Sequence, residues 1–173
     1  MLCRKMSTQD VVKEIIDAWK WSEYTFEVDK SLKDYSPHPE ELEAKSLFVG
    51  LAWNEVPGDV LTLDFPNPLL IGTIAIRYYM PAFMIFSLQN PEDFALQERL
   101  ADGLLRVPKR RHSVDSFSER FNELSFNQKQ SVAAFMRHVA LAYGEDTRVR
   151  RRIMHSIIQF WDRDGSLQPS RTF

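Results

Sequence analysis

Residues 69–88 read LLIGTIAIRYYMPAFMIFSL, and this stretch decides what kind of fold the chain forms. Fifteen of its 20 residues are apolar, which is close to the length of a membrane-spanning helix. Arg77, however, lies near the middle, where insertion of a cation costs roughly 2.5–3.5 kcal/mol. Pro81 adds a break, because proline has no N–H and clashes with the preceding helical turn. We therefore predict a buried central helix, kinked or divided into two pieces that meet around residues 79–82.

Amphipathic helical patterns flank this stretch on both sides. Before it, Ser7 caps a helix that is predicted to reach about Tyr24, and Pro39 begins another that stops near Gly50. Residues 29–39 are predicted to be a polar connection, residues 53–59 a loop and residues 61–68 an extended segment. After the central stretch, further helices are predicted over residues 90–106, 117–124, 125–144 and 148–161.

Two helix starts in the second half carry explicit capping signals. Asn90 followed by Pro91 has the form of a capping side chain with proline in the first helical position. Ser125 and Gln128 fit a capping box, in which the two side chains satisfy free backbone donors reciprocally.

No segment shows the period-two alternation of a strand. The fold class is therefore predicted to be all-α, an irregular single-domain bundle of six or seven helices around the proline-kinked apolar helix. The domain is predicted to cover residues 1–164, with residues 165–173 as a disordered tail.

The composition is that of a globular intracellular protein. The chain has 173 residues, of which 44% are hydrophobic and 27% charged. Cys3 is the single cysteine, so no internal disulfide can form, and the N-terminus lacks the apolar core of a signal peptide. These features predict a cytoplasmic location and no membrane association.

Charge is distributed unequally along the chain. Residues 1–100 carry 9 lysines and arginines against 16 acids, a net charge of −7. Residues 101–173 carry 13 against 8, a net charge of +5. The two halves either neutralise each other internally or present two surfaces of opposite sign.

The sequence contains no recognised catalytic or cofactor-binding motif. Phosphate loops, dinucleotide fingerprints and nucleophile elbows are absent, and the four histidines have no ligand spacing. His138 and His155 lie on separate predicted helices, so only the fold decides whether they meet. We predict no cofactor and no metal site. Arg77 is interpreted as a structural anchor, whose long stem is buried while its head reaches a carboxylate or open helix carbonyls.

Three segments resemble an uncharacterised bacterial family. The first is the loop Trp53-Asn54-Glu55-Val56-Pro57, the second is the helix Arg77-Tyr78-Tyr79-Met80-Pro81-Ala82-Phe83, and the third is the stretch Arg120-Phe121-Asn122-Glu123-Leu124-Ser125-Phe126-Asn127-Gln128. The resemblance covers roughly residues 42–143 and departs where Ile76 stands in place of phenylalanine. The family has no established activity, so the resemblance implies a helical fold and little about chemistry.

Without catalytic residues, the leading functional hypothesis is a non-enzymatic protein-binding module. Its most specific form is an immunity-type protein that neutralises a bacterial toxin by docking on it, since an acidic surface suits a basic toxin. The residues predicted to form this surface are Asp34, Tyr35, Glu40, Glu41, Trp53 and Glu55.

Two alternatives remain open from the sequence. One is a regulatory or scaffold module that binds a protein, or less readily a nucleic acid, through a basic surface formed by Lys109, Arg110, Arg111, Arg148 and Arg151. The other is an enzyme of unfamiliar type, which would require a deep pocket lined by Arg77, Tyr78 and Tyr79 together with perturbed acids. The sequence does not indicate an oligomeric state.

Overall fold

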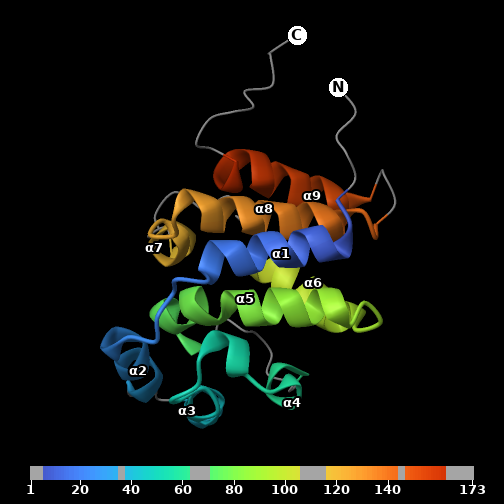
Figure 1. Ribbon diagram of the computed structural model, residues 1–173. Coiled ribbons are helices and arrows are strands. Elements are labelled where there is room, and N and C mark those ends of the chain that lie inside the picture. Colours follow the sequence, from blue (N-terminus) through green and yellow to red (C-terminus); the bar gives the residue numbers. More distant parts are fainter. Residues whose placement is uncertain (1–5, 35–37, 63–70, 106–115, 144–146, 163–173) are drawn as a thin grey trace.

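The helix predicted at the centre of the fold is α5, Thr73–Gln89, in a computed structural model that describes residues 6–34, 38–62, 71–105, 116–143 and 147–162. Eleven of its 17 residues are buried, including Tyr79 and Met80, which are fully enclosed. Helices pack on α5 from several directions, so that it forms the middle layer of the bundle (Figure 1). The prediction of an all-α bundle around this helix is confirmed.

The helix α5 runs without interruption through Pro81. The prediction that it divides into two pieces is therefore wrong. In a regular helix the N–H of residue 81 would bond to the carbonyl of Arg77, four residues earlier, but proline has no N–H to give. The indole N–H of Trp19 donates to the Arg77 carbonyl instead, at 3.2 Å. Another helix thus supplies the hydrogen bond that Pro81 removes.

Three helices build the layers on one side of α5. Helix α1, Thr8–Trp19, lies between α5 and α8, Phe126–Ala140, and α9, Arg148–Ser156, covers the far face of α8 (Figure 1). A short π-helical turn, η3, Ile157–Trp161, continues α9. The predicted Ser7 cap and the predicted capping box of Ser125 with Gln128 are both present, and Ser7 also forms a capping box with Asp10. The first helix nevertheless ends at Trp19 and not near Tyr24.

The other side of α5 is covered by short elements. These are α2, Phe26–Lys33, α3, Pro39–Ser46, the 3₁₀ turn η1, Trp53–Glu55, and α4, Gly58–Thr62. Because α2 lies where a polar connection was predicted and α4 where a loop and extended chain were predicted, the bundle has more helices than the six or seven expected. Thr25 explains α2: its hydroxyl accepts from the Val28 N–H at 3.3 Å, and Val28 and Leu32 then bury one face.

The two remaining helices are α6, Phe94–Gly103, and α7, Ser116–Phe121. The prediction that Asn90 caps α6 is wrong, because Asn90 closes α5 by donating from its side-chain amide to the Phe86 carbonyl at 2.8 Å. Asp93 caps α6 in its place and accepts from the Leu96 N–H at 2.9 Å. The predicted tail, residues 165–173, lies outside the described residues.

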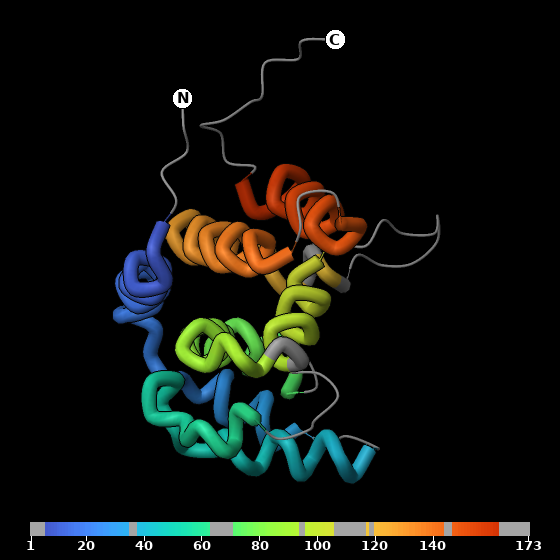
Figure 2. Tube along the Cα trace, turned by 90° about the vertical axis from the view of Figure 1, so that its right-hand side faces the viewer, coloured from blue at the N-terminus to red at the C-terminus, as the bar shows by residue number. Residues whose placement is uncertain are grey.

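The fold separates the two charges of the chain. The elements at one end, α2, α3, η1 and α4, belong to residues 22–62, which contain nine acids and three lysines and so carry a net charge of −6. Helix α9 begins with Arg148, Arg150, Arg151 and Arg152 and lies at the opposite end of the molecule (Figure 2). The most acidic segment and the arginine-rich helix therefore lie at opposite ends, while Arg77 pairs with Glu123 between the two halves. Among the residues with assigned positions, no helix is both long and apolar enough to cross a membrane.

The bond between Trp19 and the Arg77 carbonyl is testable with a pair of substitutions. Trp19→Phe removes the donor, and a buried carbonyl without a partner costs about 1–3 kcal/mol. Pro81→Ala restores an N–H within α5 that can bond to the same carbonyl. In urea unfolding measurements we therefore expect Trp19→Phe to lower the free energy of unfolding by a smaller amount in the Pro81→Ala background than in the wild type. Equal losses in the two backgrounds would show that the indole matters only for its volume.

Candidate functional site

The tyrosines of α5 hold the loop that precedes it in the sequence. The Tyr78 hydroxyl accepts from the Trp53 backbone N–H at 3.4 Å. The Tyr79 hydroxyl reaches the carbonyls of Phe48 and Leu51, each at 2.8 Å. The Trp-Asn-Glu-Val-Pro loop and the tyrosine-proline helix, which carried the family resemblance, are therefore one structural unit.

Tyr24 fixes the same loop from the other side. Its hydroxyl donates to Asp29 at 2.9 Å and accepts from the Gly50 N–H at 2.9 Å, and its ring meets Tyr78 edge-on, with the ring centres 5.8 Å apart. Gly50 has a φ of 78°, which glycine adopts without strain. Burial is the main reason why the pKa values of Tyr24 and Tyr78 are raised. The chain from residue 48 to residue 55 is thus fixed at several points.

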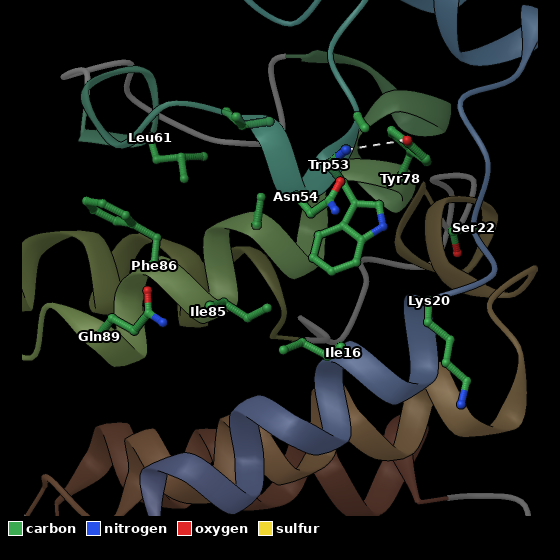
Figure 3. A pocket seen from close by; sticks show the side chains of 13 residues that line it. Ile16, Lys20, Ser22, Trp53, Asn54, Leu61, Tyr78, Ile85, Phe86 and Gln89 are labelled. Carbon is green, nitrogen blue, oxygen red and sulfur yellow. Dashed lines mark hydrogen bonds between the residues drawn. The ribbon is translucent and has the colours of Figure 1, made fainter.

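A groove with a volume of about 530 Å³ runs between α1 and this loop, with α5 as its floor (Figure 3). Its size lies within the range of roughly 300–1,000 Å³ that is typical of ligand pockets. The floor residues follow one face of α5 at helical spacing, and the two walls come from α1 and from η1 with α4. The lining residues are Ile16, Lys20, Ser22, Ala52, Trp53, Asn54, Val56, Leu61, Tyr78, Ala82, Ile85, Phe86 and Gln89.

The chemistry of the groove is mostly apolar. Its polar side chains include Lys20, Asn54 and Gln89, and its described lining contains no carboxylate and no histidine. Tyr78 lines the groove, whereas Arg77 and Tyr79 are not among its described lining residues. Such a groove is suited to contact with apolar groups.

The structure divides the predicted acidic surface between two places. Asp34 and Glu40 are exposed on the layer formed by residues 22–62, which we call the acidic layer. Glu41 lies on the same layer, half-buried and 4.0 Å from the ammonium of buried Lys45. Tyr35 lies outside the described residues.

The other two predicted residues belong to η1. The indole of Trp53 lies at the groove between α1 and α5 (Figure 3). The Glu55 side chain is exposed and accepts from the Ala52 N–H at 3.3 Å. Trp53 is therefore part of the groove, while Glu55 lies exposed on the same turn of the acidic layer.

Two exposed aromatic side chains border the acidic layer and were missed by the sequence analysis. Trp21 is 85% exposed and Phe26 is 75% exposed. The exposed acids Glu23 and Glu27 lie between and beside them in the sequence. The signal was present in the pattern, because Trp21 is two positions after buried Trp19, a spacing that places it on another face of a helical turn. We call Trp21 and Phe26 the aromatic pair.

Arg77 connects the central helix to the second half of the chain. Its guanidinium donates to the carboxylate of Glu123, in the turn before α8. The Arg77 side chain is 15% exposed, whereas that of Glu123 is 75% exposed. This contact is the kind that a structural anchor makes, and the role of Arg77 stays a prediction.

Of the predicted basic surface, only part can be placed. Arg148 and Arg151 are exposed on α9, whereas Lys109, Arg110 and Arg111 lie outside the described residues. His138 contacts Thr8 at the start of α1, at 3.3 Å, while His155 is exposed on α9. Within the part of the chain that has assigned positions, no three potential metal ligands are grouped together.

A comparison with known protein families identifies the family of this chain. The chain belongs to the family of unknown function DUF6714. The match covers residues 13–165, and so includes α1 from residue 13 onward, the groove, the acidic layer and α9. Membership of an uncharacterised family was predicted and is confirmed. No curated protein and no solved structure matches the chain.

The Tyr79 hydroxyl offers a test of how the loop is held. Tyr79→Phe removes the hydroxyl donor that the Phe48 and Leu51 carbonyls share, and since the bond to Phe48 is buried we expect the free energy of unfolding to fall by about 1–3 kcal/mol. Burial also raises the pKa of Tyr79 above 10.0, the ordinary value of tyrosine. The unfolded chain then loses this proton first as the pH rises, so stability is retained below pH 10 and falls above it.

In chemical denaturation at several pH values, the wild type should therefore lose stability above pH 10 more steeply than Tyr79→Phe. Tyr24→Phe is the matched control, since that hydroxyl is less enclosed. If the stability of the wild type and that of Tyr79→Phe fell equally above pH 10, the raised pKa of Tyr79 would not account for the alkaline loss of stability.

Proposed function

We propose that this protein is a non-enzymatic protein-binding module that docks a basic partner protein through the acidic layer. The aromatic pair carries this proposal. Tryptophan and other large aromatics are concentrated in the centres of protein interfaces, where each can bury about 150–250 Å². Trp21 and Phe26 instead expose most of their surface, although the same bundle buries Trp19 and Trp161 almost completely. An exposed aromatic pair beside a charged surface has the composition of an interface centre with its polar rim.

The charge of the acidic layer indicates the sign of the partner. Asp34, Glu40 and Glu43 are exposed on α2 and α3, in a layer with a net charge of −6. A field of one sign accelerates the approach of an oppositely charged protein, and this effect weakens as salt is added. The partner is therefore expected to be basic, and its association rate to fall with ionic strength.

The finer proposal is that the partner is a bacterial toxin, which docking neutralises. It rests on the charge of the acidic layer, because enzymes that act on polyanions such as nucleic acid carry positive surfaces. Whether the partner is a toxin is decided by identifying the protein that the pull-down described below retains, and this question is separate from whether docking occurs.

A second candidate function uses the opposite end of the molecule. Arg148 and Arg151 are exposed on α9, together with Met154 of α9 and Ile158 of η3, which are 36% and 51% exposed. This face combines positive charge with apolar side chains, and so favours a regulatory or scaffold role with an acidic protein. A nucleic acid is a less favoured partner, because no aromatic side chain is interleaved with these arginines.

The two candidates are separated by comparing baits in a quantitative pull-down from the native host, read by mass spectrometry. We expect wild type to retain a basic partner and the double variants Trp21→Ser with Phe26→Ser, and Asp34→Lys with Glu43→Lys, to lose about tenfold or more of it. Asp34 and Glu43 lie away from helix N-termini, so lysine there does not oppose a helix dipole.

Two further baits serve as controls. Glu92→Lys changes an exposed acid outside the acidic layer and should retain the partner. If binding survives both acidic-layer variants and is lost with Arg148→Glu and Arg151→Glu, the second candidate is correct. Circular dichroism melting of every bait ensures that each variant is folded.

A further inference from the structure

We infer that the groove between α1 and η1 is the seat of an amphipathic helix supplied by the basic partner. This inference rests on the proposed function and names the part of the partner that is recognised. The groove is a separate surface from the aromatic pair, although Lys20 and Ser22, which line it, flank Trp21 in the sequence.

The shape of the groove matches a helix. Its floor follows α5 from Tyr78 through Ala82 and Ile85 to Gln89, which is about three helical turns or roughly 16 Å. The two long walls, α1 and the η1–α4 segment, lie on either side of this floor (Figure 3). A bound helix that presents apolar side chains at positions i, i+4 and i+7 spans about 10 Å and fits within this length.

The chemistry of the floor favours apolar anchors. Ala82, in the middle of the floor, has the smallest side chain of the floor residues and is 8% exposed. Ile16 is 43% exposed on one wall, and Trp53 is only partly buried on the other. These surfaces would leave water if leucine-sized groups were seated between them, at a gain of about 25 cal/mol for each Å² of apolar area.

The charged residues at the rim of the groove predict the charge on the outer face of the bound helix. Glu55 and Asp59 are exposed on η1 and α4, the wall that continues into the acidic layer. On the α1 wall, Lys20 is 3.6 Å from Asp17, so part of its charge is already balanced. Lysines or arginines on the outer face of the bound helix would therefore lie near the negative charge of Glu55 and Asp59 on the η1–α4 wall, and the two charges are complementary.

The test uses a synthetic peptide of about 18 residues, long enough to form an isolated helix. It carries leucines at i, i+4 and i+7 and lysines on the opposite face. A fluorescent label on the peptide reports binding to the full chain by anisotropy. Two control peptides have the same length, one with the leucines scattered around the helix and one with glutamate in place of lysine.

The chain offers a matched pair of substitutions. Ile16→Glu places a carboxylate on the groove wall, whereas Ile158→Glu makes the same change at a similarly exposed isoleucine on η3. We expect the patterned basic peptide to bind more tightly than both controls. Ile16→Glu should weaken its binding about tenfold or more, while Ile158→Glu should change it less than about twofold. Neither side chain is buried, so both variants should fold.

Three results would overturn the inference. They are equal binding of the patterned and scattered peptides, equal binding by wild type and Ile16→Glu, and concentration-dependent self-association of wild type that Ile16→Glu removes. The last result, from sedimentation, would assign the groove to a second copy of the chain. The proposed function can still stand in each case, because its own test depends on the aromatic pair and on Asp34 and Glu43. If those variants retain the native partner, the proposed function fails whatever the peptide shows.

Discussion

The hydrogen bond from the Trp19 indole to the Arg77 carbonyl allows an apolar helix with a proline at its middle to remain one piece. Each buried backbone group needs a partner, and Pro81 deprives α5 of one donor. Because Trp19 ends α1, this single bond also fixes where α1 lies against α5. The continuous α5 then serves as the shared support for the helices on both of its sides and as the floor of the groove.

The same helix organises the candidate site through its tyrosines. Tyr78 and Tyr79 face the loop from residue 48 to residue 55, so the side chains that were recognisable in sequence as a motif are those that hold Trp53 at the groove. The proposed binding surfaces are the groove, which α5 and the loop form together with α1, and the acidic layer with the aromatic pair. The acidic layer and α9 lie at opposite ends of the molecule, and the two candidate functions are proposed to use one end each.

Sequence reasoning failed where a local signal competed with a tertiary contact. Pro81 is a helix breaker by itself, and the indole that compensates for it lies 62 residues earlier in the chain. Asn90 resembles an N-cap, but its amide is used to close α5, since Asp93 is better placed to cap α6. Helix α2 was missed because its apolar side is limited to Val28 and Leu32, too few to show a period among charged neighbours.

The sequence by itself determined the helical class, the central position of residues 73–89 and the caps at Ser7 and Ser125, because these follow from periodicity and local hydrogen bonding. It also determined that the two halves differ in charge. Only the tertiary structure decided that these charges lie at opposite ends and that Trp53 lines a groove. Those outcomes depend on which helices pack together, and packing partners distant in sequence leave no local pattern to recognise.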